Sequence, residues 1–314
     1  MPSDPASVIT IDCLYLQPEH AAAYLMIEEG RAAFVDTNTM HAVPLLLKAL
    51  EKRGIGRENV AYIIPTHLHL DHGGGASALL NECPNADVLA HPRAVRHLID
   101  PSRLIEGVKA VYGEAEFERL YAPILPIDAG RVRGVEDGET LRFGDRVLTF
   151  MHTRGHANHH ICIYDSKSNG VLAGDVFGVE YKAWRPTKRP FLMCSSAPAD
   201  FDPDEARASI RRIVDMGVER VFVAHYGEVA AVREGAEVML ESIGRMEAIL
   251  KDATASGLTG VELQRYCEER VRAAVEEQIA DCGTVLEEGA WSTLDTGIRI
   301  DALGLACIAE RSRG

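Results

Sequence analysis

A cluster of metal-binding residue types stands out near residue 70. The stretch Thr66–Gly75 reads Thr-His-Leu-His-Leu-Asp-His-Gly-Gly-Gly, so three histidines and an aspartate fall within six residues. Imidazole and carboxylate together are typical ligands of zinc, iron or manganese. For a single histidine, an incidental place in a polar loop would be the better interpretation. For a cluster of this density we favour a metal site.

The surroundings of this cluster predict two groups of ligands. The apolar run Val60–Ile64 before it is expected to be a buried strand, and the glycines after it allow a tight turn. On an extended stretch His67 and His69 point the same way and can share one metal, because side chains alternate. Asp71 and His72 lie past the bend and can face a second metal.

Further ligand types follow three other short apolar segments. Each comes shortly after a predicted strand: His156 after Arg146–Met151, Asp175 after Gly170–Ala173 and His225 after Arg220–Ala224. Strand ends and the loops that leave them are where α/β proteins place their chemistry. Because the same arrangement recurs with suitable side chains, we expect these residues to complete the metal site.

This order of motifs resembles the metallo-β-lactamase superfamily. The match consists of His-x-His-x-Asp-His at residues 67–72, then a Gly-His, a Gly-Asp and a late histidine, and it includes Asp36 after the predicted strand Ala32–Val35. It covers about the first 230 residues. The resemblance implies an α/β fold, an αββα sandwich with a binuclear metal site at one edge.

The resemblance also assigns roles to these residues. It implies two divalent ions, with zinc favoured and iron or manganese as alternatives. The implied ligands are, for the first ion, His67, His69 and His156; for the second, Asp71, His72 and His225; and, as a bridge between them, Asp175. Asp36 and Thr66 would orient the ligands from behind. An ordinary turn at the end of a strand is an equally good reading of Asp36.

Two more histidines follow the Gly-His motif. The stretch that contains His156, His159 and His160 resembles the corresponding part of glyoxalase II. His160 is expected to begin the strand Ile161–Tyr164, with its ring behind the metal ligands. Neither His159 nor His160 is assigned to a metal.

The segment after the Gly-Asp motif gives the clues to the substrate. In the superfamily it commonly lines the pocket, so Phe177, Tyr181 and Trp184 are expected to form an apolar wall, with polar handles on the last two. Packing in the core is the alternative for each of them. Residues 201–212 resemble the acyl-homoserine-lactone lactonases, which place a tyrosine where this chain has Gly178.

Charge and composition exclude some partners. The formal net charge is −14, whereas proteins that bind nucleic acid neutralise phosphates with lysine and arginine, so no nucleic-acid partner is expected. No apolar run is long enough to span a membrane, and Met1–Pro5 lacks the basic start of a signal peptide. Seven cysteines without a CxxC pair indicate reduced thiols. We therefore expect a cytoplasmic enzyme with a small-molecule substrate.

Toward the C-terminus the pattern changes to long helices. We expect a catalytic domain at residues 1–230 and a helical extension at 231–314. The predicted helices are Val229–Ala255, Thr259–Ile279, Trp291–Thr296 and Ala302–Glu310. In glyoxalase II such an extension covers the active site, so these helices would form a lid. A stabilising layer or a homodimer interface is the alternative, since an apolar helix face must be buried against something.

These features together predict a hydrolase. We expect a binuclear enzyme in which a metal-bridging hydroxide attacks an ester-like bond, a thioester or a lactone, in a small and largely apolar acyl substrate. Asp71 would orient this nucleophile and pass on its proton. One alternative is a mononuclear iron oxidoreductase like the persulfide dioxygenases. Another is a non-catalytic regulatory protein that only binds a ligand.

Overall fold

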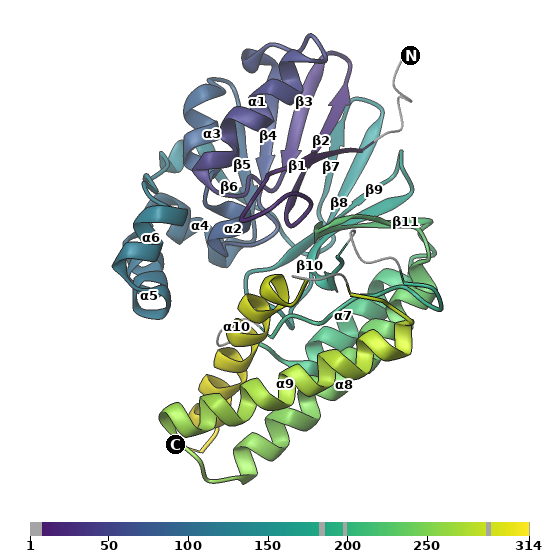
Figure 1. Ribbon diagram of the computed structural model, residues 1–314. Coiled ribbons are helices and arrows are strands. Elements are labelled where there is room, and N and C mark those ends of the chain that lie inside the picture. Colours follow the sequence, from purple (N-terminus) through teal and green to yellow (C-terminus); the bar gives the residue numbers. More distant parts are fainter. Residues whose placement is uncertain (1–7, 182–185, 197–199, 287–289, 314) are drawn as a thin grey trace. The chain divides into compact units, whose positions relative to one another are not determined.

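Two six-stranded sheets form the framework of the protein. The computed structural model describes residues 8–181, 186–196, 200–286 and 290–313 (Figure 1). The strand order is β1-β2-β3-β4-β5-β6 in the first sheet and β12-β11-β10-β9-β8-β7 in the second. Helices flank the strands, and the long helices α8, α9 and α10 come last in the chain. This is the α/β architecture that the resemblance implied.

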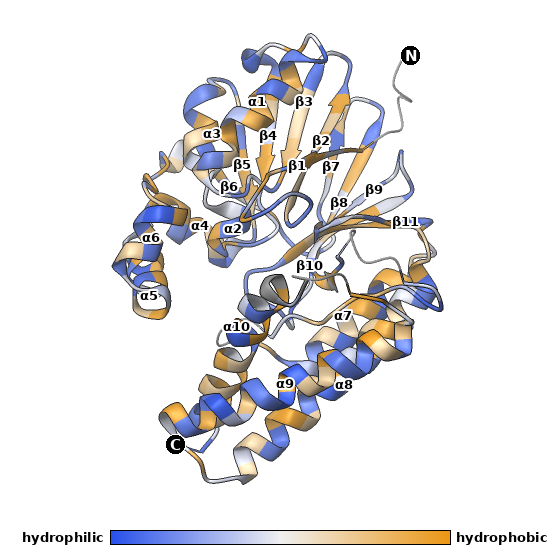
Figure 2. Ribbon diagram, viewed as in Figure 1, coloured by the Kyte–Doolittle hydropathy of each residue, from blue (hydrophilic) through white to orange (hydrophobic). Residues whose placement is uncertain are grey.

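The first sheet is antiparallel at one edge and parallel at the other. β1 and β2, and β2 and β3, pair in antiparallel fashion, whereas β3 to β6 pair in parallel. The inner strands β3 and β4 are apolar along most of their length (Figure 2), as expected for parallel strands covered on both faces. The strands are β1 (Ile9–Asp12), β2 (Ala22–Glu28), β3 (Arg31–Val35), β4 (Val60–Ile64), β5 (Asp87–Ala90) and β6 (Val132–Gly134).

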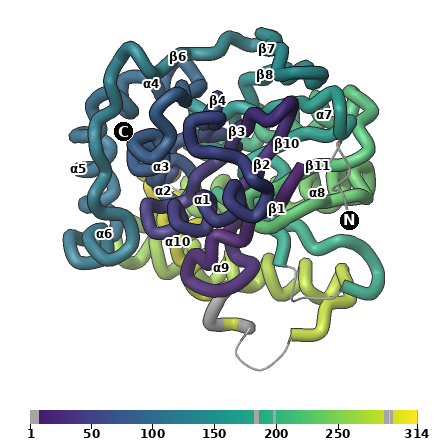
Figure 3. Tube along the Cα trace, turned by 90° about the horizontal axis from the view of Figure 1, so that it is seen from above, coloured from purple at the N-terminus to yellow at the C-terminus, as the bar shows by residue number. Residues whose placement is uncertain are grey.

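Helices that follow these strands complete the core of the first sheet. In α1, Leu46 and Leu50 lie one turn apart on the same face, and both are fully buried in one cluster with Phe34 of β3. Seen from two directions, α4, α5 and α6 lie together at one edge (Figure 1, Figure 3). The helices are α1 (Val43–Glu51), α2 (Leu70–Gly73), α3 (Ala76–Glu82), α4 (Pro92–Ile99), α5 (Ser102–Tyr112) and α6 (Glu114–Leu120).

The second sheet contains the later strands. β7, β8, β9 and β10 form consecutive antiparallel pairs, in which His152 at the end of β8 lies opposite Ile161 at the start of β9. The strands are β7 (Thr140–Phe143), β8 (Arg146–His152), β9 (Ile161–Asp165), β10 (Gly170–Val179), β11 (Arg220–His225) and β12 (Gly227–Val229). The segment between β8 and β9 therefore begins and ends at neighbouring points of the sheet.

The chain divides into two compact units, each of which consists of three separate stretches of the sequence. Unit 1 consists of residues 1–152, 159–174 and 224–227, and unit 2 consists of residues 153–158, 175–223 and 228–314. Strands β10 and β11 continue from one unit into the other. The division into a catalytic domain and an extension at residue 230 stays a prediction.

Unit 2 is mainly helical. Its helices are α7 (Pro203–Asp215), α8 (Val232–Ala255), α9 (Gly260–Cys282) and α10 (Ala290–Arg311). α7 packs against α8, and α8, α9 and α10 pack against one another. Asp202 caps α7 by accepting hydrogen bonds from the backbone of Asp204 and Glu205 (3.0 and 3.1 Å). None of the helices in the described ranges is long and apolar enough to cross a membrane.

The prediction of two separate helices at the C-terminus was wrong. Residues 290–311 form the single helix α10. Leu294, Ile298 and Leu305 are fully buried at helical spacing, so one apolar face continues through Gly297. A single glycine lowers helix propensity by only about 1 kcal/mol, and this face more than offsets that cost.

A buried ionic network joins the two sheets within unit 1. Arg146 of β8 is fully buried; it donates to Glu28 of β2 through Nε (2.8 Å) and also pairs with the buried Asp165 of β9. Lys167 adds a second positive charge at Glu28 (Nζ to Oε1, 2.7 Å). Two acidic and two basic side chains thus compensate one another's charges in a region where solvation by water is limited.

Removal of the central arginine should therefore destabilise the protein strongly. We expect Arg146→Ala to lower the free energy of unfolding by about 3–5 kcal/mol, because two carboxylates stay buried with reduced compensation. Denaturant titration would measure this. Arg133→Ala is the matched control, because Arg133 is half exposed beside Glu139, and should cost no more than about 1 kcal/mol. Equal losses in the two variants would contradict the role of the buried network.

Candidate metal centre

The histidine-rich motif lies on the loop that leaves β4. His69 precedes α2 with an extended backbone (φ −62°, ψ 142°), and Asp71 and His72 lie within α2. The predicted bend between the two pairs of ligand types is therefore present. His67 and His72 are only 1% exposed. Their rings are 4.2 Å apart between centroids, so two bases are concentrated in a small buried volume.

Asp71, His72 and His225 form one candidate group within unit 1. Their ligand atoms all lie within 4.8 Å of one another. Asp71 Oδ2 lies 3.4 Å from His225 Nε2 and 3.6 Å from His72 Nε2. Two atoms bound to one tetrahedral ion at about 2.1 Å would lie about 3.4 Å apart. The three side chains therefore fit a single divalent ion.

His67 and His69 supply a second pair of ligand atoms in unit 1. His67 Nε2 lies 3.0 Å from His69 Nδ1. On the other side of the ring, His67 Nδ1 lies 3.1 Å from Thr66 Oγ1. The Thr66 hydroxyl gives its one proton to Asp36, so it accepts from His67 Nδ1–H. That tautomer leaves the Nε2 lone pair of His67 directed toward His69.

Asp36 sits behind both parts of this loop. Its carboxylate accepts hydrogen bonds from Thr66 N (2.7 Å) and Thr66 Oγ1 (2.9 Å), and Oδ2 lies 3.5 Å from His72 Nδ1. Asp36 is 1% exposed and has a left-handed backbone (φ 58°). Asp36 and Thr66 thus occupy the places expected of residues that orient ligands, and this role remains a prediction.

Unit 2 contributes the pair His156 and Asp175. His156 Nε2 lies 3.4 Å from Asp175 Oδ2, again the separation expected for two ligands of one ion. His156 Nδ1 faces the carbonyl oxygen of Ser195 at 3.4 Å. Gly155 (φ 119°) allows this loop to approach α7 closely, since a Cβ there would collide with the backbone of Ala206.

The position of Asp175 differs from the prediction. The strand expected at residues 170–173 continues as β10 to Val179, so Asp175 lies inside a strand and not after one. The apolar run that follows keeps the strand going, and Val179 pairs with Met193. Gly174 (φ 50°) interrupts the regular backbone just before Asp175.

The seven predicted ligands therefore form two candidate metal-binding groups. These are His67, His69, His156 and Asp175, and Asp71, His72 and His225. The second group lies wholly in unit 1.

His160 lies beside His67 in unit 1, and its role behind the metal ligands stays a prediction. It is fully buried, and its ring centroid is 5.1 Å from that of His67. A Cβ on Gly174 would lie 2.5 Å from His160 Nε2 and 2.7 Å from Thr66 Oγ1, so only glycine fits there. His159 instead accepts a hydrogen bond from the backbone of Leu68 (3.4 Å).

Three residues near the second group were missed from the sequence. The carbonyl oxygen of His20 accepts from His225 Nδ1–H (2.8 Å), and the His20 ring lies 6.0 Å from that of Tyr15. The hydroxyl groups of Tyr15 and Tyr121 share a hydrogen bond of 2.9 Å. A backbone carbonyl leaves no signal in the sequence, and the two tyrosines are 106 residues apart.

The residues expected to line the substrate pocket are only partly described. Phe177 is fully buried, and a Cβ on Gly235 of α8 would lie 3.3 Å from its ring. Tyr181 is 7% exposed, with its ring 6.1 Å from that of Phe191. Trp184 lies outside the described residues. A role in substrate binding stays a prediction for all three.

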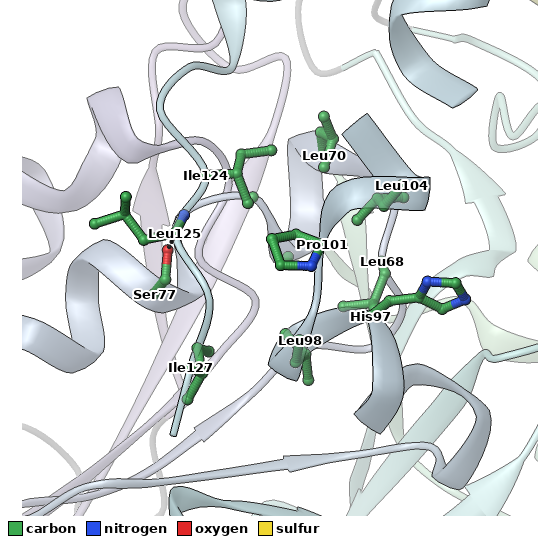
Figure 4. Close-up of a pocket in the computed structure, with 12 residues that line it drawn as sticks. Leu68, Leu70, Ser77, His97, Leu98, Pro101, Leu104, Ile124, Leu125 and Ile127 are labelled. Carbon is green, nitrogen blue, oxygen red and sulfur yellow. Dashed lines mark hydrogen bonds between the residues drawn. The ribbon is translucent and has the colours of Figure 1, made fainter. Parts of the chain in front are cut away.

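The leucines of the motif anchor it to the core of unit 1. Leu68 and Leu70 alternate with the histidines and point into an apolar pocket with Leu98, Leu104 and Ile124 (Figure 4). This cavity has a volume of only about 10 Å³, too small for an organic ligand and barely enough for one water. The apolar contacts around this cavity therefore hold the loop in place, and the cavity does not bind substrate.

The two groups lead to a prediction about metal content. We expect the full chain, stripped and then reloaded, to bind two divalent ions. His225→Ala should lose chiefly the ion of the second group, because one of three ligands is removed. Elemental analysis of the dialysed protein would measure this, and His41→Ala, at an exposed histidine, is the matched control. A limit of one iron per chain in the unaltered protein would instead favour the dioxygenase alternative.

Comparison with protein families finds a match over the stretch that contains all seven candidate ligands. The model of the Metallo-beta-lactamase superfamily matches residues 16–225, more than half of the chain. A metallo-beta-lactamase fold-containing protein of Sulfurisphaera tokodaii is 24% identical over 268 residues, which cover 83% of this chain and 93% of that protein.

Two further relatives have names that include a reaction. The acyl-coenzyme A thioesterase MBLAC2 of Homo sapiens is 26% identical over 182 residues, 54% of this chain and 57% of that protein. A hydroxyacylglutathione hydrolase of Synechococcus sp. is 29% identical over 156 residues, 48% of this chain and 47% of that enzyme. The chain thus spans about half the length of these two relatives.

Solved structures share the fold. A metallo-beta-lactamase superfamily protein from Sulfolobus tokodaii has a TM-score of 0.65 at 20% identity and covers 95% of this chain and 98% of its own. A metallo-beta-lactamase family protein from Thermus thermophilus has a TM-score of 0.64 at 20% identity, with 98% and 93% covered. Identity at this level shows a common fold alone.

Proposed function

The chain belongs to the metallo-β-lactamase superfamily and is a metallo-hydrolase; we propose that it cleaves an ester-like bond, a thioester or a lactone, in a small and largely apolar acyl substrate. The observation that carries the proposal is the complete set of ligand types in two groups. The choice of bond is supported by the relatives, because acyl-coenzyme A and hydroxyacylglutathione, in their names, are both thioesters.

Covalent connection limits the distance between the ligand types of the first group. Gly174, which packs on Thr66, is bonded to Asp175, and consecutive Cα atoms are only about 3.8 Å apart. His156 is four residues from His160, which lies beside His67. The chain therefore limits how far His156 and Asp175 can be from the histidine motif.

The residues of the two groups suit hydrolysis. Two divalent ions held by them would lower the pKa of water toward neutrality and polarise a carbonyl group. Asp71 is the most exposed carboxylate of the set, with 24% of its side chain accessible, whereas the side chain of Asp175 is 5% accessible. Asp71 can therefore orient a nucleophile and pass its proton to solvent.

The tyrosine pair provides a hydrogen-bond donor close to this carboxylate. Burial and the negative charge of Asp71 raise the pKa of both Tyr15 and Tyr121, so both hydroxyls keep their protons at neutral pH. Only one of the two protons is needed for the bond between them. We propose that the other binds the carbonyl or leaving-group oxygen of the substrate.

The persulfide dioxygenase-like alternative has less support. A mononuclear iron enzyme needs one complete group of ligands, whereas Asp71, His72 and His225 form a second group that fits an ion by itself. A non-catalytic role has less support for the same reason, because no ligand type is missing from either group.

Turnover of a substrate panel tests the proposal. The zinc-loaded full chain would be given S-acyl thioesters of increasing acyl length, matched oxygen esters, acyl lactones and a phosphodiester oligonucleotide, and product would be followed by chromatography. We expect the short apolar thioesters or lactones to be cleaved, His72→Ala to abolish that cleavage and the oligonucleotide to stay intact. Absence of turnover on every thioester and lactone by protein shown to hold two ions would overturn the proposal.

A further inference from the structure

One short segment of unit 2 is held by all of the last three helices. Each helix directs a buried polar side chain at the backbone of residues 192–196: Ser242 of α8 accepts from Cys194 N (3.0 Å), Gln278 of α9 donates to Leu192 O, and Asp301 of α10 accepts from Ser196 N (2.6 Å). The three side chains are between 1% and 3% exposed. The C-terminal helices thus fix the path of this segment and not merely cover it.

Asp301 makes the most extensive of these attachments. Its Oδ1 accepts from both Ser196 N (2.6 Å) and Ser195 Oγ (3.3 Å). In return, Ser196 Oγ donates to the backbone carbonyl of Asp301 (3.2 Å). Three hydrogen bonds therefore clamp two successive residues onto one turn of α10, which restrains the direction of the peptide between them.

The segment clamped in this way also contacts a predicted metal ligand. The carbonyl oxygen of Ser195 lies 3.4 Å from His156 Nδ1. A carbonyl oxygen can only accept, so this contact requires a proton on Nδ1 and leaves the lone pair on Nε2. Nε2 is the atom that lies 3.4 Å from Asp175 Oδ2.

We propose that Asp301 is a positioning residue for the metal ligand His156: it fixes Ser195, whose carbonyl oxygen in turn fixes the tautomer and rotation of the His156 ring. The inference rests on the proposed function, in which His156 binds a metal. It also gives the C-terminal helices a task at the metal centre that does not require them to move as a lid.

Simple helix packing does not explain an aspartate at this position. The neighbouring inward positions of α10, Ile298 and Leu305, are apolar, and a buried carboxylate costs more than an apolar side chain of similar size. Burial raises the pKa of Asp301 to about 7, against the effect of the hydrogen bonds from Ser196 and Ser195. The polar group at residue 301 is therefore retained at some cost in stability, which favours a role in orientation.

Metal affinity, measured without any substrate, tests the inference. The stripped full chain and its variants would be titrated with zinc in competition with a chromophoric chelator, well above the pKa of Asp301, and with cobalt to record the ligand-field spectrum. Loss of a partner behind a metal-bound histidine typically costs about 10–100-fold in affinity. We expect Asp301→Ala to lower the affinity for one of the two ions by that factor and to change the cobalt spectrum of that site. The affinity for the other ion should stay within about threefold of that of the unaltered chain.

Two further variants separate orientation from stability. Asp301→Asn keeps an oxygen for Ser196 N and should fall between Asp301→Ala and the unaltered chain; if Asp301→Ala does not fold, a loss of at least about threefold in Asp301→Asn decides the matter. Asp295→Ala is the matched control, because Asp295 lies on the same helix and pairs with Arg272 of α9 (2.8 Å). It should leave both affinities unchanged.

The outcomes distinguish this inference from the function on which it rests. An unaltered chain that binds no ion would overturn both. An unaltered chain with two ions, together with Asp301→Ala that holds both equally well, would overturn the positioning role alone. An equal loss in Asp295→Ala would also overturn it, because the effect would then follow from the stability of α10.

Discussion

Asp175→Ala is expected to reduce turnover of every substrate by about three orders of magnitude or more, the scale of effect expected when activation of water is lost. The carboxylate is 6% exposed and lies 3.4 Å from His156 Nε2. If it bridges the two groups, its removal takes a ligand from both at once. The metal content should fall together with the activity, and both can be measured on the same sample.

Controls for this variant separate chemistry from folding. Asp175→Asn keeps the volume of the side chain and loses its charge, so it should retain the fold and still be severely impaired. Asp215→Ala, at an exposed aspartate in the same unit, should have normal activity and metal content. Near-normal turnover and two bound ions in Asp175→Ala would show that the assigned site is wrong.

The sequence predicts best where one local signal determines the outcome. The strand Val60–Ile64 has the predicted bounds, because this short apolar run is followed directly by a proline, Pro65. The bend within the motif is equally local, since His69 is extended and the helix α2 begins at the next residue, Leu70. The ligand types could be identified for the same reason, because they recur in order after apolar segments.

Prediction was less accurate where packing over a longer range decides. Asp175 lies inside β10 because that strand gains a partner at Met193, which is distant in sequence. α10 continues through Gly297 because its apolar face is buried along its whole length. The glycines Gly174 and Gly297 favour an end to these elements, and burial of the neighbouring apolar residues overrides that preference.

The contacts behind the ligands were the hardest to predict. His67 donates from Nδ1 to a threonine hydroxyl, whereas His156 and His225 face the backbone carbonyl oxygens of Ser195 and His20. A carbonyl oxygen is present at every residue, so sequence cannot show which one is used. All three contacts place the proton on Nδ1 and leave the Nε2 lone pair for a metal. Each of the three histidines needs this tautomer to bind a metal through Nε2.

Asp36 contacts both Thr66, beside His67, and the ring of His72, and Asp36→Ala should therefore weaken the binding of both ions. Its carboxylate holds Thr66, which orients His67, and its other oxygen faces His72 Nδ1 at 3.5 Å. We expect each affinity to fall by about 10–100-fold. Stability should also fall by about 1–3 kcal/mol, because the buried Thr66 N–H loses its acceptor.

Two comparisons make this prediction decisive. Asparagine at residue 36 tolerates the left-handed backbone (φ 58°) and keeps an oxygen for Thr66 N, so Asp36→Asn should restore most of the stability. The ion beside His72 should stay weakly bound in this variant, since an uncharged amide replaces the carboxylate. Asp100→Ala is the matched control, because Asp100 also accepts from a backbone N–H (Ser102, 3.1 Å) but is exposed. Zinc competition and denaturant titration on the three variants would measure both quantities. If Asp36→Ala lost stability but bound both ions as tightly as Asp100→Ala, Asp36 would be the strand-ending turn residue that its sequence equally allowed, and the ligands would be oriented without it.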